Sequence, residues 1–118
     1  MEYMLLLHVD PAGLQALRDA ERTTSLAAYT AYTQALQQSG ALRGGNRLRD
    51  AEVATTVRVR DGKTEVLNGP FIETREQLGG YYLIDVPGLD QALEWAARCP
   101  AASHGTVEVR PVWAMGAA

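Results

Sequence analysis

Cysteine and histidine are scarce in this chain of 118 residues, which contains one cysteine, Cys99, and two histidines, His8 and His104. A single thiol cannot form a disulfide within the chain. The two histidines do not stand at an i, i+4 spacing or at another spacing typical of metal ligands, so the sequence predicts no metal site. A chain without a disulfide framework is typical of a reducing compartment, and we therefore expect a cytoplasmic protein.

Long hydrophobic runs and a strong charge of one sign are also missing. The apolar run Met4–Leu7 is too short for a signal peptide and has no basic segment before it. No stretch approaches the roughly 18 apolar residues of a membrane-spanning helix. The formal net charge is -3, and the arginines between positions 43 and 60 are interspersed with acidic residues. The sequence therefore indicates neither membrane nor nucleic acid as a partner, and it predicts no fixed cofactor.

The composition is that of one globular domain. Hydrophobic residues make up 47% of the chain and charged residues 21%, which is ordinary for a protein with a packed core and far from the composition of disordered chains. A chain of this length has room for one core, so residues 1–118 are predicted to form a single domain.

Local patterns near the N-terminus predict a strand followed by helix. Residues 2–9 are apolar on both alternating faces, as in a central strand. Residues 10–21 predict a short helix. The main helix is expected over residues 23–40, with Thr23 or Thr24 as its N-cap. Its apolar stripe, which should face a sheet, consists of Leu26, Tyr29, Thr33 and Leu36.

The clearest local signal is a hairpin at Asp61-Gly62. These two residues separate two alternating runs and have the composition that a type I′ turn prefers. The resulting register places Arg58 opposite Glu65, so opposite charges face each other. It also places Val57 opposite Val66.

Three further elements are predicted after the hairpin. Residues 80–86 have the pattern of a strand, residues 89–99 that of a helix, and residues 105–113 that of an edge strand, because Pro111 cannot donate to a ladder. Gly44-Gly45, in the strand after the main helix, indicates a bulge or a close approach to the backbone. The inward face of the second helix is expected to consist of Leu89, Leu93, Ala96 and Ala97.

The order of these elements predicts an α+β class, with a ferredoxin-like βαββαβ fold and an inserted β-hairpin. Helices cover only one face of such a sheet, and the other face here keeps apolar side chains whichever way the strands are turned. Burial of that face against a twofold copy would form a homodimer. Its two sheets would enclose a barrel-like space for a small molecule.

A longer motif, NGPFIETREQLGGYYLID, occupies residues 68–85. Together with LDQALEWAARCP and VEVRPV further along, it resembles the YCII-related proteins, and in particular the DGPF-domain subgroup, over nearly the whole chain. Asn68 stands where that subgroup typically has aspartate. The resemblance implies a dimeric α/β barrel, in a group that includes small enzymes acting on unsaturated lactones or aromatics.

The resemblance transfers no catalytic residue. In the wider YCII group a His-Asp pair is proposed as catalytic, with its histidine on the first long helix, but residues 23–40 of this chain contain no histidine. Genes for DGPF-type proteins often lie beside genes for extracytoplasmic-function sigma factors. That association implies a regulatory partner as an alternative to an enzyme.

The residues themselves make His8 and Asp85 the candidates for acid/base catalysis. If the first and third core strands are parallel neighbours, their C-terminal ends bring the two side chains together, with His104 near the same end. A carboxylate would then fix the histidine tautomer, as a general base requires. The alternative is that both are strand-end residues partnered by backbone or water. Arg110 could clamp a substrate carboxylate, or it could pair with a neighbouring glutamate across strands or subunits.

The motif allows two interpretations as well. Asn68, Glu73 and Arg75 could form a ligand-binding polar rim over the mouth of the barrel. Alternatively, the segment is a turn that Phe71 anchors to the core, with a solvated charged face. Two functions stay open: a small enzyme on an organic, carboxylate-bearing substrate, and a non-catalytic binding or regulatory module that engages a ligand or a protein such as a sigma factor.

Overall fold

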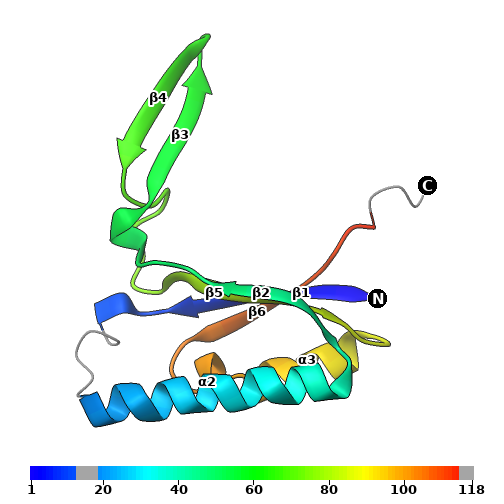
Figure 1. Cartoon of the computed structure of the whole chain (residues 1–118). Helices are drawn as coiled ribbons and strands as arrows, with labels where there is room; N and C mark the ends of the chain where they lie inside the picture. The colour runs from blue at the N-terminus through cyan, green and yellow to red at the C-terminus, as the bar shows by residue number, and fades with distance from the viewer. Residues whose placement is uncertain (13–18, 115–118) are drawn as a thin grey trace.

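A computed structural model describes residues 1–12 and 19–114. The main layer is a four-stranded antiparallel sheet with the strand order β2-β5-β1-β6. Helices α2 and α3 cover one face of this sheet, and the other face carries no helix among the described residues (Figure 1). The architecture confirms the predicted ferredoxin-like α+β fold. Its elements are β1 (Glu2–Val9), α2 (Asp19–Ser39), β2 (Leu42–Arg47), β5 (Gln77–Asp85), α3 (Leu89–Arg98) and β6 (Thr106–Pro111).

The inserted hairpin stands apart from this body. It consists of β3 (Thr55–Arg60) and β4 (Lys63–Asn68), and it projects from one end of the sheet, on the side away from the helices (Figure 1). Asp61 and Gly62 have φ angles of 52° and 73°, the positive values that a type I′ turn requires at both positions. The predicted register is confirmed, since Arg58 pairs with Glu65 and its neighbour Val57 with Val66.

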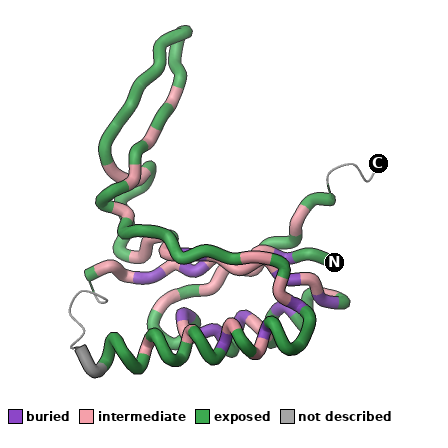
Figure 2. The backbone as a smooth tube through the Cα atoms, in the orientation of Figure 1, coloured by how far each residue is buried: buried purple, intermediate pink, exposed green. Residues whose placement is uncertain are grey.

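The core lies between the sheet and the two helices (Figure 2). Strand β1 alternates strictly, and its odd-numbered residues from Tyr3 to Val9 are buried under the helices. Tyr32 of α2 ties the layers together, because its hydroxyl donates a hydrogen bond of 2.6 Å to the carbonyl oxygen of Trp95. The edge of its ring also packs against Tyr82, with 5.3 Å between the ring centroids. The largest fully buried side chains are Leu5, Leu36, Ile84 and Cys99.

Strand direction corrects one expectation. Strands β1 and β5 were expected to be parallel, but they are antiparallel neighbours, with Glu2 opposite Asp85. Each helix crosses over between two parallel strands, β1 with β2 and β5 with β6, and an antiparallel strand fills the gap between them. Since β1 and β5 run in opposite directions, their C-terminal ends lie at opposite ends of the sheet along the strand direction.

The helix boundaries and faces also differ from the predicted ones. Helix α2 already begins at Asp19, so Thr23 and Thr24 lie inside it and do not cap it. The residues that precede them are good helix formers, which lets the helix extend toward the N-terminus. Of the predicted helix over residues 10–21, positions 13–18 lie outside the described residues.

The inward face of helix α3 is only partly the predicted one. Ala96 is buried as predicted, together with Ala92, whereas Leu89, Leu93 and Ala97 are exposed. The small alanine side chains let the helix approach the rest of the core closely. Trp95 fills the space beside them and packs against the core from its partly buried position.

Candidate ligand-binding cleft

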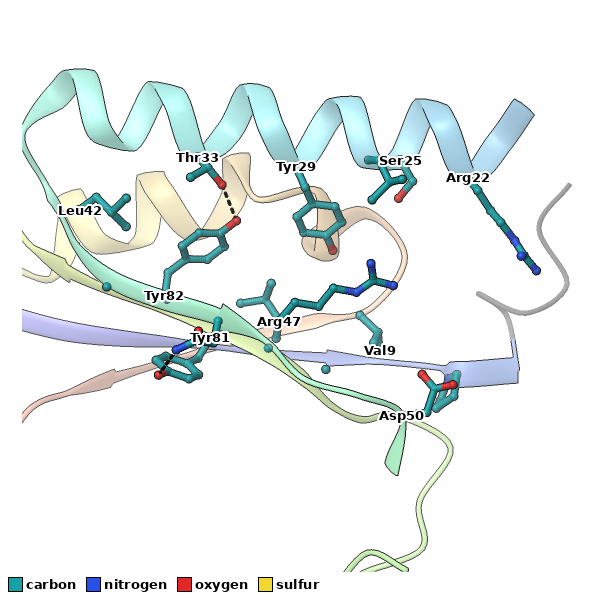
Figure 3. A pocket seen from close by; sticks show the side chains of 18 of the residues that line it. Val9, Arg22, Ser25, Tyr29, Thr33, Leu42, Arg47, Asp50, Tyr81 and Tyr82 are labelled. Carbon is teal, nitrogen blue, oxygen red and sulfur yellow. Dashed lines mark hydrogen bonds between the residues drawn. The ribbon is translucent and has the colours of Figure 1, made fainter. Parts of the chain in front are cut away.

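A cleft of about 760 Å³ lies between α2 and the helix-covered face of the sheet (Figure 3). Helix α2 forms one wall with Leu26, Tyr29 and Thr33, three of the four residues predicted for its apolar stripe. The opposite wall is the sheet itself, where Leu7 and Val9 of β1 contribute apolar side chains. The volume falls in the range of roughly 300–1,000 Å³ that is common for small-molecule sites.

Glycines make the sheet side of the cleft flat. Gly44 and Gly45 of β2 and Gly79 and Gly80 of β5 all line it. A Cβ atom on Gly45 would come within 2.9 Å of the carbonyl oxygen of Tyr81, and one on Gly80 within 2.9 Å of the carbonyl oxygen of Asn46. The pairing of β2 with β5 is irregular between Leu42 and Gly44, which confirms the predicted bulge. These strands pack so closely because two of the positions have no side chain.

Polar groups reach the cleft at a few points. The Oγ1 atom of Thr33 and the hydroxyl of Tyr82 form a hydrogen bond of 2.8 Å across it, from α2 to β5 (Figure 3). Arg47, at the end of β2, extends its side chain into the cleft toward Tyr29 (Figure 3). Arg22 and Asp50 lie at its edge. A mostly apolar cleft with convergent donors is suited to hold and orient a small organic molecule.

Burial raises the pKa values of the cleft phenols, which are already above neutral pH, still further. It raises the pKa of Tyr29 to about 12, against the smaller opposing effect of the Arg47 charge. Burial also raises the pKa of Tyr82, although the hydrogen bond with Thr33 acts in the opposite direction. At neutral pH both hydroxyl groups are therefore uncharged hydrogen-bond donors.

The described residues offer no metal site, because no three histidine, cysteine, aspartate or glutamate side chains gather in that part of the chain. No helix within the described ranges is both long and apolar enough to cross a bilayer.

Comparison with known proteins places the chain in a family. Residues 1–116 match the YCII-related domain. The chain belongs to the YCII-related family. An uncharacterised protein of Rhizobium meliloti (strain 1021) is 37% identical to this YCII-related protein over 114 residues, which cover 95% of this chain and 92% of that protein.

The fold also occurs among solved structures. An example is the 5-chloro-2-hydroxyhydroquinone dehydrochlorinase TftG from Burkholderia phenoliruptrix AC1100, in complex with 2,5-dihydroxybenzoquinone. The TM-score is 0.55 at 16% sequence identity, and the alignment covers 96% of this chain and 94% of TftG. At this identity the likeness establishes the fold alone.

The predicted pair of His8 and Asp85 is not formed. In this YCII-related protein His8 lies near the C-terminal end of β1, opposite Thr106 of β6, whereas Asp85 is paired with Glu2 at the other end. The carboxylate beside His8 is instead Glu108, whose Oε1 atom lies 3.2 Å from the histidine Nε2 atom. His8 also alternates with Leu7 and Val9, which line the cleft, so its side chain lies on the uncovered face of the sheet.

Asp85 and Arg110 have structural partners. Asp85 accepts a hydrogen bond of 2.8 Å from the N-terminal amine, and this contact holds the pKa of the carboxyl below its usual range. The Nε atom of Arg110 donates to Glu108 Oε2 at 2.9 Å. This glutamate lies on the same strand, β6, and not across strands or subunits as the alternative predicted. Hydrogen bonds from Arg110 and from His8 lower the pKa of Glu108.

The polar rim was predicted over the mouth of the barrel between two sheets, and its residues do not line the cleft beside α2. None of Asn68, Glu73 and Arg75 is among the described residues that line it. Arg75 pairs with Asp10, with 3.2 Å between Nε and Oδ2. The motif does form a turn, since Gly69 has a φ angle of 105° and donates a 2.7 Å hydrogen bond to the Ala54 carbonyl oxygen.

Phe71 does not anchor that turn to the core. Its side chain is 71% exposed and lies 5.8 Å from the guanidinium carbon of Arg58 on the hairpin. The ring therefore contacts the projecting hairpin through a cation–π arrangement. The turn at Gly69 places the ring outside the core.

Sequence reasoning missed Arg47 as a site residue. It considered this arginine only as one of those between positions 43 and 60 that are interspersed with acidic residues. The available signal was the Gly44-Gly45 pair directly before it, which marked a close approach to the backbone. Tyr29 and Thr33 were placed correctly on the face of α2 that is turned to the sheet.

Proposed function

We propose that this YCII-related protein binds a small, planar organic molecule in the cleft between α2 and the sheet. The observation that carries this proposal is the cleft itself, with a volume of about 760 Å³, a flat glycine surface on one side and tyrosine hydroxyls on the other. A flat surface and apolar walls favour a ring-shaped ligand, and neutral phenols favour ligand oxygens as acceptors. TftG, which has the same fold, binds 2,5-dihydroxybenzoquinone, a molecule of this size and type.

The cleft also limits the chemistry that we propose for it. Its described lining residues include no histidine, and Asp50 is the one carboxylate among them. Tyr29 can donate a hydrogen bond to an oxygen on the ligand and so stabilise negative charge that develops there. His8 lies on the other face of the sheet and does not act on a molecule in this cleft.

A pair of tryptophan substitutions on α2 tests the ligand site. Leu26 lines the cleft yet is 56% exposed, so Leu26→Trp fills the mouth without disturbing the core. We expect this variant to bind 2,5-dihydroxybenzoquinone at least about tenfold more weakly than the wild type, a change of about 1.4 kcal/mol. Isothermal titration calorimetry measures the affinity, with related hydroxylated benzoquinones and phenols as further probes.

Ala28→Trp is the matched control, because Ala28 is exposed on α2 and is not among the residues that line the cleft. It adds the same side chain to the same helix and should leave the affinity unchanged. Equal weakening by both substitutions, or no saturable binding of any probe to the wild type, would contradict the proposed function.

A homodimer through the uncovered sheet face is a second part of the proposal. That face carries the half-buried apolar side chains of Met4 and Leu6 on β1 and of Leu83 on β5. The hairpin and the C-terminal segment rise on this side at opposite ends of the sheet (Figure 1). An isolated two-stranded hairpin is only marginally stable in water. A second copy seated between these projections would cover the sheet and support the hairpin.

Leu6→Asp is expected to convert the dimer to a monomer, because a carboxylate cannot be buried at an apolar interface without a partner. Size-exclusion chromatography with light scattering should give about twice the chain mass of 12.8 kDa for the wild type and a single chain mass for the variant. Leu93→Asp is the control, since Leu93 is exposed on α3. If the wild type is monomeric, the proposed homodimer is refuted, whereas the proposed ligand site in the cleft is not.

The contact between His8 and Glu108 supports a second candidate function, an acid/base site enclosed between the two sheets of the dimer. Glu108 would orient the imidazole, as Asp85 was expected to do. A crystal of protein purified from a cell lysate tests it, because a ligand at this site must lie within hydrogen-bond reach of His8. An interface closed by apolar side chains around His8 excludes the site. The regulatory alternative, engagement of a sigma factor, stays a prediction.

A further inference from the structure

The Arg47 guanidinium indicates which class of ligand the cleft binds. Its side chain lies on the cleft side of β2, opposite Gly80 of β5, and extends over the flat glycine surface (Figure 3). Within the described ranges it forms no ion pair and no side-chain hydrogen bond. Arg75 and Arg110, by contrast, are held by carboxylates.

Tyr29 supplies a second donor beside this arginine. Its hydroxyl makes no hydrogen bond within the described part of the chain, and its ring faces the cleft (Figure 3). Among the described lining residues, Arg22, Arg47 and Asp50 are the formally charged ones, and their charges sum to one positive charge. Arg22 has an interaction of its own. Arg47 is therefore the cation that extends over the cleft.

The rest of the cleft sets the shape of the ligand. Apolar side chains adjoin these donors. Leu7 of β1 lies opposite Gly80 on one side, as Arg47 does on the other, and Leu42 lies at the start of the strand that Arg47 ends. The Thr33 and Tyr82 hydroxyls, 2.8 Å apart, already satisfy one another. The cleft thus offers, beside apolar walls, two donors without a partner among the described residues.

We infer that the cleft selects a monoanionic molecule whose acidic group, a carboxylate or an acidic enol, is bound by the Arg47 guanidinium and the Tyr29 hydroxyl, while its ring lies on the glycine surface. This inference rests on the proposed function and specifies its ligand class. A planar guanidinium matches the two oxygens of such a group with two parallel hydrogen bonds. Since neither donor has a partner in the part of the chain that the structure describes, the ligand displaces only water from them.

Pairs of compounds that differ only in charge test the inference. Benzoate and benzamide have nearly the same shape, as have cinnamate and cinnamamide, and each is titrated at neutral pH into the full chain while two-dimensional amide NMR spectra are recorded. We expect the wild type to bind each acid at least about tenfold more tightly than its amide, because a hydrogen bond to a charged partner contributes about 1.5–3 kcal/mol.

Substitution of the arginine should remove this preference. In Arg47→Met the acid and the amide are expected to bind with affinities within about threefold of each other. Arg47→Lys keeps the charge but not the planar fork, so its preference for the acid should lie between that of Arg47→Met and that of the wild type. Arg60→Met is the control. Arg60 lies at the tip of the hairpin and is not among the residues that line the cleft. Its substitution by methionine removes the same charge. Thermal melts confirm that each variant is folded.

The possible outcomes separate this inference from the proposed function. If acid and amide bind the wild type equally, and Leu26→Trp weakens both, the cleft is a ligand site and the anion anchor is wrong. An acid preference that persists in Arg47→Met also overturns the anchor, because the anion is then bound elsewhere. If neither acids nor amides bind at millimolar concentration, both the anchor and the ligand site are refuted.

Discussion

Leu36→Ala is expected to lower the free energy of unfolding by about 2–5 kcal/mol, the usual cost of removing a large buried side chain. Leu36 lies on α2 at the interface with the sheet and is completely buried, with 0% of its surface exposed. The substitution removes apolar area from the core and leaves a cavity that the rigid sheet cannot close. Urea denaturation followed by circular dichroism, at a fixed protein concentration, measures the change.

Leu26→Ala is the matched control on the same helix. Leu26 lies at the open end of the cleft with more than half of its surface exposed, so its truncation should cost less than about 1 kcal/mol. The comparison tests which part of the α2 stripe packs against the sheet and which part borders the cleft. Similar losses for the two variants would mean that α2 lies closer to the sheet along its whole length than the structure shows.

Much of this fold was predictable because its signals are local. The Asp61-Gly62 turn fixes the register of the hairpin, since the backbone conformation it needs is available to few residue pairs. The alternation in β1 and the position of Pro111 at an edge follow from rules that involve only neighbouring residues. The element order then leaves few topologies, and the ferredoxin-like arrangement is the one observed.

The candidate site was less predictable because it depends on which strands meet. The proposed pairing of His8 with Asp85 assumed parallel neighbours, and the antiparallel pairing of β1 with β5 moves the two side chains to opposite ends. Glu108 could be identified as the partner of His8 only once β6 was placed beside β1. The pattern of α3 was ambiguous for a similar reason, because leucines that look like a core face are exposed when alanines pack inward.

The cleft itself illustrates the limit of sequence patterns. A cavity is a volume left between α2 and the sheet, and no single residue encodes it. In the sequence the cleft is indicated by the glycine pairs on β2 and β5, because a strand position without a side chain leaves space above it. Each pair alone has an explanation as a bulge or a turn. Their meaning appears when the register places both pairs on neighbouring strands of the sheet.

Gly45→Ala is expected to destabilise the protein by about 1–3 kcal/mol, the usual cost of overpacking. The new Cβ atom would lie 2.9 Å from the carbonyl oxygen of Tyr81 and 3.0 Å from Cδ1 of Tyr82. The first of these is a backbone atom of the paired strand, so β2 must move away from β5 and the glycine surface of the cleft is distorted. Denaturant unfolding measures the loss, and ligand titration should show weaker binding of the same probes.

Gly44→Ala is the adjacent control, and it decides between crowding and a general requirement for glycine in β2. A Cβ atom on Gly44 meets nothing within 4 Å, and the φ angle at this position is not in the left-handed region. Alanine there removes freedom from the unfolded chain, so its effect should be neutral or stabilising by up to about 1 kcal/mol. If Gly44→Ala destabilises as much as Gly45→Ala, the bulge needs glycine at both positions and the close approach of β5 is not the cause.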